Sequence, residues 1–295
     1  MMTSIAYPAL KYTGEAPYGS CYQQCLANLL AWRGLPGAES VLTLSWGAQA
    51  YPDTGRLAGS PRFLQAANRT HDVGLTAHRF ADFVAAFDAE SAALGDGPVA
   101  AAVDAFYLRS PYEGIEHLAH CVLLVSANPN GVVIIDPMNQ PIPVAYSVDQ
   151  WRDMRSGSAA ENFLLFTARS RTPAKATAAD VLSAWAADVR ENAADLDEIA
   201  LYAKVIAESG LLADVSGLAA ERMYLTKLAR YLTATYPELE PIAAGFASLT
   251  RRWYLVHTLA RESGRTDARV VRMVRDLIDR EKQQLDLTLT TLEGR

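Results

Sequence analysis

"HCVLLVSANPNGVVIIDP", residues 120–137, decides the fold of the N-terminal part of this chain. Two apolar runs of strand length flank an Asn-Pro-Asn-Gly turn signal, and Asn-Gly is a strong marker of a hairpin. His120 begins the first run and Asp136 ends the second. If the hairpin folds near Asn128, the two side chains become cross-strand neighbours, with Cβ atoms about 4.5–5.5 Å apart when directly opposed. A carboxylate there can fix the tautomer and orientation of the imidazole.

A cysteine opens the first predicted helix, in "PYGSCYQQCLANLLAWRG", residues 17–34. Cys21 follows a Gly-Ser turn, and Gly34 is a typical helix stop. The N–H groups of a first helical turn lack intrahelical partners, and together with the helix dipole they stabilise a thiolate. They can also stabilise an oxyanion on an attacked carbonyl. We therefore expect Cys21 to be a nucleophile, His120 its base and Asp136 the carboxylate that orients the base.

The other thiols and one other histidine are weaker candidates for these roles. Cys25 lies one turn inside the helix among apolar residues, and the side chain of Cys121 points to the opposite strand face from His120, so both are expected in the core. His117 competes with His120 as the base and is expected to line the cleft. Three cysteines do not make a disulfide framework, and no second ligand pair has zinc spacing, so no metal site is expected.

Secondary-structure patterns divide the chain into an α+β domain, residues 1–170, and an all-α helical bundle domain, residues 175–295. The first contains a helical pattern over 81–97 and buried-strand patterns over 98–108 and 162–169, besides the hairpin. A polar linker with a proline, "SRTPAKATAAD", joins the two. Four amphipathic helices, typical of a bundle, are predicted at 179–209, 218–236, 242–263 and 268–293.

Composition and charge exclude several classes of function. Half of the residues are hydrophobic and a fifth are charged, which is typical of an ordered globular protein. The net charge of −6 disfavours nucleic acid as a partner. No apolar run approaches the ~20 residues of a membrane span, and the N-terminus lacks the pattern of a signal peptide. A cytoplasmic protein that binds neither nucleic acid nor membrane is expected.

These motifs resemble a known family. The chain order Cys, His, Asp, with the cysteine opening a long helix and the other two on adjacent strands, resembles papain-like cysteine peptidases, especially the compact peptidases that trim bacteriocin leaders. "SCYQQCLANLLAWRG", "VAAAVDAFYL" and "HLAHCVLLVSANPNGVVIIDP" resemble more closely the N-terminal domain of the butirosin biosynthesis protein H family. The resemblance covers most of residues 15–140, and residues 175–295 share only general helical character with that family.

The resemblance implies a papain-like fold and a cysteine acyltransferase of antibiotic or other natural-product biosynthesis. The founding member of the family moves an aminoacyl group from an acyl-carrier protein onto an amine of an aminoglycoside. Cys21 matches the nucleophile, His120 the base and Asp136 the orienting carboxylate. The implied partners are an acyl- or peptidyl-carrier protein, whose phosphopantetheine bears the acyl group, and a small-molecule amine. No cofactor of the protein's own is implied.

Four residues are expected to contact substrate: Tyr22, Asp104, Tyr107 and His117. Two positions depart from the family pattern. Glu15 stands where the bacteriocin-type peptidases have a glutamine that completes the oxyanion hole, and Tyr22 stands where glycine is common. The second oxyanion donor therefore has no assignment from the sequence.

Other functions are compatible with the same residues. A hydrolase would pass the acyl group to water, a cyclase would pass it to an amine of the same molecule, and an inactive papain-like module would only bind a carrier protein or peptide. Arginines of the helical domain form either a solvated face paired with aspartates or a docking surface for an acidic carrier protein, and the domain could also form a homodimer. These are Arg251, Arg252, Arg261, Arg265, Arg269, Arg272, Arg275 and Arg280.

Overall fold

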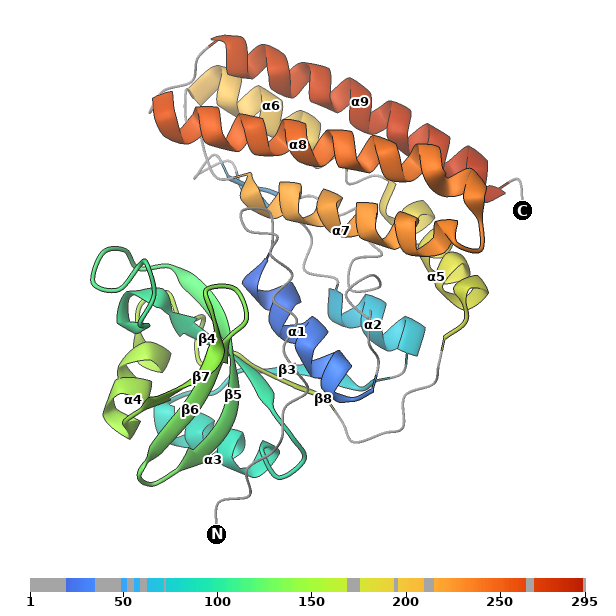
Figure 1. The fold of residues 1–295 in the computed structure, drawn as a ribbon. Helices are drawn as coiled ribbons and strands as arrows, with labels where there is room; N and C mark the ends of the chain where they lie inside the picture. Colours follow the sequence, from blue (N-terminus) through green and yellow to red (C-terminus); the bar gives the residue numbers. More distant parts are fainter. Residues whose placement is uncertain are drawn as a thin grey trace. The chain divides into compact units, whose positions relative to one another are not determined.

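The computed structural model divides the chain into two compact units (Figure 1). The first unit comprises Met1–Glu39 and His71–Lys175, and the second comprises Ser40–Thr70 and Ala176–Arg295. The first is a mixed α+β structure, as expected, and the second is mainly helical. No pattern in the sequence indicated that residues 40–70 group with the C-terminal helices. The residues described are 20–34, 49–51, 56–58, 63–71, 73–168, 176–193, 196–209, 215–263 and 268–293.

The first unit is built on a six-stranded antiparallel sheet of strand order β3-β8-β4-β5-β6-β7. The four predicted strands are confirmed as β4, β5, β6 and β8, whereas β3 and β7 were not predicted. Both lie at the edges of the sheet; β3 is short, and β7 contains two prolines, which an edge strand tolerates. The strands are β3 (Leu75–His78), β4 (Val99–Asp104), β5 (Ala119–Asn128), β6 (Gly131–Asp136), β7 (Gln140–Tyr146) and β8 (Leu165–Ala168).

Helices pack on both faces of this sheet. Figure 1 shows α1 (Cys21–Trp32) on the opposite side from α3 (Phe83–Ala93) and α4 (Val148–Ser156). Trp151 and Met154 of α4 share a buried apolar cluster with alternate residues of β4, β5 and β6. On the other face, the Cys25 thiol of α1 donates a hydrogen bond to the carbonyl of Cys121 on β5, at 3.3 Å. The sheet therefore fixes the position of the helix that Cys21 begins.

The hairpin between β5 and β6 closes through a two-residue turn, as its sequence predicts. Asn128 pairs with Gly131 across the turn. Gly131 has φ +153°, and a Cβ at this position would lie 2.5 Å from the carbonyl oxygen of Tyr146. A larger residue there would be strained and would also clash with the backbone of the neighbouring strand. Glycine is therefore required at the start of β6.

The second unit combines a helical group with a two-stranded antiparallel sheet. The prediction of one helix over 179–209 was wrong, because α5 ends at Asn192 and α6 begins at Leu196. Ala50 of β1 donates its N–H to Glu198 of α6, at 2.9 Å. No helix among those described is both long and apolar enough to cross a membrane. The elements are β1 (Gln49–Tyr51), β2 (Arg56–Ala58), α2 (Phe63–His71), α5 (Ala178–Asn192), α6 (Leu196–Ser209), α7 (Ser216–Thr233), α8 (Glu240–Ser263) and α9 (Ala268–Glu293).

A buried carboxylate ties the helices of the first unit to its sheet. Glu90 of α3 accepts hydrogen bonds from Arg155 Nε and Trp151 Nε1 of α4, each at 2.8 Å. Arg155 also donates to the backbone carbonyls of Ala102 and Leu164. The side chains of Glu90 and Arg155 are both fully buried. One ion pair thus connects two helices with β4 and with the segment that leads into β8.

The second unit contains a buried carboxylate with the same kinds of partners. Glu281 of α9 accepts a hydrogen bond from Arg222 Nε of α7 at 2.9 Å, and another from Trp253 Nε1 of α8 at 2.8 Å. The Arg222 and Glu281 side chains are fully buried. The carboxylate therefore joins three helices at one point.

Substitution of Glu90 by Gln is expected to destabilise the first unit by about 3–5 kcal/mol, because it leaves the Arg155 guanidinium buried without a counter-charge. Chemical denaturation followed by tryptophan fluorescence measures the loss. Glu116→Gln removes the same charge from an exposed loop and is the matched control, with an expected change within ~0.5 kcal/mol. Equal stability of the two variants would show that the buried pair does not hold this unit together.

Candidate active site

Cys21 is the first residue of α1, as predicted. Ser20 precedes it with extended backbone and makes no side-chain capping hydrogen bond. The helical ladder begins with the Gln24 N–H donating to the Ser20 carbonyl at 3.0 Å, so the ladder does not use the Cys21 amide. The first turn contains no acidic residue. A thiolate on Cys21 therefore lies in the positive field of a helix N-terminus that no neighbouring carboxylate in that turn offsets.

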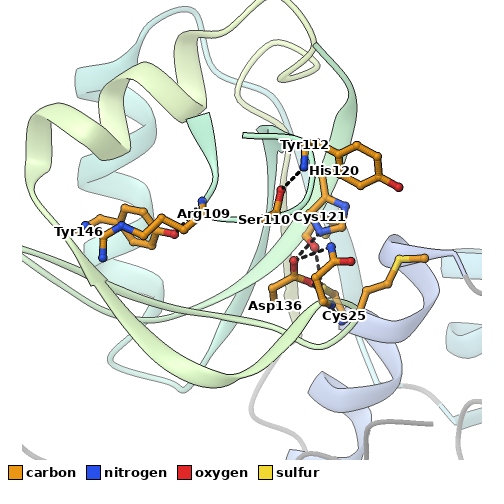
Figure 2. Close-up of polar contacts among 10 residues, drawn as sticks. Cys25, Arg109, Ser110, Tyr112, His120, Cys121, Asp136 and Tyr146 are labelled. Carbon is orange, nitrogen blue, oxygen red and sulfur yellow. Dashed lines mark hydrogen bonds and ion pairs between the residues drawn. The ribbon is translucent and has the colours of Figure 1, made fainter. Parts of the chain in front are cut away.

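His120 and Asp136 are in contact, as the hairpin pattern predicts. His120 Nε2 lies 3.0 Å from Asp136 Oδ2, and both side chains are almost completely buried (Figure 2). A carboxylate oxygen accepts, so Nε2 carries the proton of this hydrogen bond. The other ring nitrogen, Nδ1, is then the one available to a thiol. The hairpin pattern predicts this relation between imidazole and carboxylate.

The two residues are not directly opposed, which corrects the predicted register. Leu123 pairs with Ile135, so continuing the ladder would place Val122, not His120, opposite Asp136. The offset arises because the two-residue turn lies at residues 129–130, later than the expected fold near Asn128. The β-bulge between Leu124 and Ser126 then moves the residue opposite Asp136 from Leu123 to Val122, one position nearer to His120. A bulge adds one unpaired residue to one strand and moves every later pair by one position. His120 consequently reaches Asp136 diagonally, a separation that a long side chain can span.

A turn after β6 holds the Asp136 carboxylate in place. The backbone N–H groups of Met138 and Asn139 donate to Oδ1, at 3.0 and 3.2 Å. The side-chain amide of Asn139 donates to Oδ2 at 2.9 Å. Burial raises the pKa of Asp136, but these hydrogen bonds and the one from His120 outweigh burial and lower it. The carboxylate is therefore ionised and fixed. Asn139 was not identified from the sequence, although Asp-Pro-x-Asn is a recognisable turn.

Cys21 and His120 are electrostatically linked. Burial of the ring lowers the pKa of His120, but the charge of Cys21 and hydrogen bonds with Asp136 and Cys21 raise it well above its usual value. A raised pKa favours the imidazolium form of His120. The predicted nucleophile, base and orienting carboxylate are thus brought together in one chain of contacts.

The other two cysteines belong to the core, as expected. Cys25 and Cys121 are both fully buried, whereas Cys21 is partly exposed. Burial raises the pKa of Cys25 well above its usual value, so it stays a thiol. Figure 2 shows these two cysteines beside His120 and Asp136. Among the residues described, no group of His, Cys, Asp or Glu side chains is arranged to hold a metal ion.

Tyr22 is held by the segment that precedes β8. Its hydroxyl donates to Glu161 Oε1 at 2.8 Å, and its ring meets Phe166 edge-on at 5.9 Å. Burial raises the pKa of Tyr22, so the hydroxyl stays protonated and acts as a donor. Glu161, Asn162 and Phe163 all have positive φ between 52° and 55°, a strained conformation for residues other than glycine. The sequence contains no glycine there to signal it.

Asp104, Tyr107 and His117 form one cluster. Asp104 is fully buried and its Oδ2 lies 2.7 Å from His117 Nδ1. The His117 ring stacks on Phe106, with centroids 4.2 Å apart and planes 10° apart, and it meets Tyr107 edge-on at 6.0 Å. His117 is half exposed. Phe106 was not identified from the sequence, and Glu15, the residue expected near the oxyanion, lies outside the described residues.

The arrangement supports nucleophilic chemistry at Cys21. In such an arrangement a cysteine sulfur can attack an electrophilic carbonyl, free helix N–H groups can donate hydrogen bonds to the oxyanion, and an imidazolium can supply a proton to the leaving group. No protein-family model matches the chain, and a search of curated proteins finds no significant match.

Replacing Cys21 by Ala is expected to lower the pKa of His120, because burial would then be opposed by Asp136 alone. Titration of the imidazole signals by NMR measures the shift. Cys25→Ala, one helical turn further on, removes a thiol from the core and is the control, with a smaller change expected. An unchanged His120 pKa in Cys21→Ala would show that no thiolate–imidazolium pair exists.

Proposed function

We propose that this protein is a cysteine acyltransferase that moves an acyl or aminoacyl group from a carrier-protein thioester to an amine. The observation that supports this most directly is the placement of the buried His120, which lies 3.0 Å from Asp136 on one side and hydrogen-bonds with Cys21, the first residue of α1, on the other. An ion pair between an imidazolium and a cysteine thiolate keeps the sulfur nucleophilic at neutral pH without a metal ion. The resemblance to papain-like enzymes and to the butirosin biosynthesis protein H family is consistent with it.

The acylation step uses the thiolate and the imidazolium together. Cys21 Sγ attacks the carbonyl carbon of the donor thioester, and the tetrahedral oxyanion faces the amide groups at the start of α1. Collapse breaks the bond between that carbon and the carrier sulfur, and His120 gives its proton to the departing thiolate. The products are an acyl-Cys21 thioester, a free carrier thiol and a neutral His120. Exchange of one thioester for another is nearly balanced in energy, which suits a thiol nucleophile.

The deacylation step restores the resting state. The amine nitrogen attacks the acyl carbon, the bond to Cys21 Sγ breaks, and the sulfur leaves as a thiolate. His120 takes a proton from the attacking nitrogen and becomes an imidazolium again. Asp136 stabilises that charge and keeps the imidazole oriented toward the sulfur. Three N–H groups and His120 hold the Asp136 carboxylate in place.

A carrier protein and a small amine are the proposed partners. Two arginines of the predicted docking surface, Arg252 and Arg280, lie 3.7 and 2.8 Å from Asp276 and are partly exposed. These contacts are those expected of a solvated face on which arginines pair with aspartates. Because the guanidinium groups are partly exposed, an acidic partner could also contact them. A hydrolase or cyclase with the same three residues is the alternative, since water or an internal amine could meet the same acyl-enzyme.

The acyl-enzyme is the test of this function. Incubation with acyl-loaded carrier proteins and with small acyl thioesters is expected to add the mass of one acyl group to the wild type and nothing to Cys21→Ala. Intact mass spectrometry measures the adduct, and Cys25→Ala, which keeps the nucleophile, should still acquire it. Release as an amide when amines are added indicates transfer, whereas release as the free acid indicates hydrolysis. No adduct from any donor would contradict the proposal.

Alkylation separates an enzyme from an inactive binding module. Native protein is expected to take up one equivalent of iodoacetamide, on Cys21, because Cys25 and Cys121 are fully buried. The rate at pH 7 should exceed that of a free thiol such as glutathione and fall at least ~10-fold in Asp136→Asn, which no longer stabilises the imidazolium. Peptide mapping identifies the site. A rate equal to that of glutathione would favour the binding module.

A further inference from the structure

The first unit contains a second His–carboxylate pair close to the first. Asp104 and His117 are 2.7 Å apart, and Asp104 lies at the end of β4 while His117 precedes β5 by two residues. In the sheet register Asp104 pairs with Ala119, and Val103 pairs with His120. The two histidines are three positions apart in the chain, so their Cα atoms lie within about 10 Å. The start of β5 therefore supports both histidines, while their carboxylate partners lie at the ends of the two strands that flank it, Asp104 on β4 and Asp136 on β6.

The second pair is built as firmly as the first. Asp104 Oδ1 accepts from the Phe106 N–H at 3.1 Å, and Oδ2 accepts from the Ala159 N–H at 3.3 Å as well as from His117. A Cβ at Gly157 would lie 2.5 Å from Oδ2, so the backbone of that loop closes directly over the carboxylate. Burial raises the pKa of Asp104, but its hydrogen bonds outweigh burial and lower it. The carboxylate is ionised and shielded from water.

The ring of His117 is oriented for proton uptake. An ionised carboxylate only accepts, so Nδ1 carries the proton and a neutral ring presents a lone pair on Nε2. The side chain of His117 is 47% exposed, against 7% for His120, so solvent and substrate can reach it. The face of Phe106, stacked at 4.2 Å, stabilises the ring further when it becomes a cation. His120 uses the opposite nitrogen, because its Nε2 is bonded to Asp136.

We propose that His117, positioned by Asp104, is the base that deprotonates a cationic amine acceptor before it attacks the acyl-enzyme. This inference rests on the proposed acyl transfer and specifies its acceptor as a primary ammonium group. It also gives a purpose to the proximity of two His–carboxylate pairs, one buried at the nucleophile and one open to substrate.

Proton accounting requires a second base for such an acceptor. A primary amine arrives as R–NH₃⁺ and ends as an amide N–H, so two protons leave its nitrogen. His117 Nε2 takes the first, and the neutral amine attacks the acyl carbon. The bond from that carbon to Cys21 Sγ breaks, the electron pair stays on sulfur, and His120 takes the second proton. The thiolate–imidazolium pair is regenerated, and His117 releases its proton to solvent. Water as acceptor loses only one proton in attack, which His120 alone can take.

The test compares two nucleophiles on a preformed acyl-enzyme. The enzyme is acylated with an acyl thioester of N-acetylcysteamine, excess donor is removed, and n-butylamine or hydroxylamine is added at pH 7. n-Butylamine is almost entirely protonated at this pH, and hydroxylamine is largely neutral. His117→Gln is expected to slow release by n-butylamine ~100-fold, the usual contribution of a general base, and release by hydroxylamine by less than ~3-fold. Quenched-flow mass spectrometry measures both rates.

Controls separate this role from a structural one. Asp104→Asn leaves the ring in place but removes the carboxylate that sets its tautomer. It should therefore also slow acyl release by n-butylamine and leave release by hydroxylamine nearly unchanged. His78→Gln removes an exposed histidine on the edge strand β3 and should change neither rate. Raising the pH should narrow the gap between His117→Gln and the wild type, because more of the amine is then neutral without a base.

Several outcomes would overturn the inference. Equal losses with both nucleophiles in His117→Gln would indicate a structural role, and no loss would show that His117 takes no part. If water releases the acyl group of the wild-type acyl-enzyme and n-butylamine does not, the protein is a cysteine hydrolase and His117 has no role as a second base. If no acyl-enzyme forms on Cys21, the proposed function fails and this inference fails with it.

Discussion

In each unit of this protein, one fully buried glutamate connects neighbouring helices. Glu90 holds an arginine and a tryptophan of a neighbouring helix, and Glu281 does the same with residues from two other helices. Burying both charges is costly, and breaking either pair costs more than keeping it, since the remaining charge has no partner. The directions of these hydrogen bonds also restrict how the elements can pack, which apolar contacts alone restrict less. In each unit, therefore, buried hydrogen bonds help to determine how the helices pack, and apolar contacts contribute the rest of the core.

The buried Glu90–Arg155 pair is connected to the candidate site by hydrogen bonds of the backbone. Arg155 donates to the carbonyl of Ala102, which pairs with Cys121 in the sheet, next to His120. On the other side of β5, the turn at residues 129–130 and the bulge between Leu124 and Ser126 together set the diagonal relation of His120 to Asp136. Cys21 begins a helix that packs on the same strand through Cys25. His120 thus lies on a strand whose neighbours on both sides are fixed.

Local sequence patterns predicted most of the candidate site. Contacts between residues far apart in the chain could not be predicted from such patterns. The hairpin pattern brought His120 to Asp136, and the turn before the first helix placed Cys21 at its start. Neither the position of the turn within Asn-Pro-Asn-Gly nor the bulge left a mark in the alternation of apolar residues, so the predicted register was wrong. Glu90 resembles any polar residue of an amphipathic helix, because its partner Arg155 is 65 positions away. The left-handed residues 161–163 contain no glycine, and the edge strand β7 contains prolines, so neither matched its usual sequence signal.

The division of the chain has a consequence for synthesis on the ribosome. Ala50 of β1 hydrogen-bonds with Glu198, which follows it by 148 residues. At roughly 5–20 residues per second, β1 emerges about 7–30 s before its partner helix exists. The whole sheet of the first unit is translated within that interval. A nascent chain must therefore fold the first unit while the β1–β2 pair still lacks the helix that it packs against. Misfolding, or a need for chaperones, is most expected in this interval.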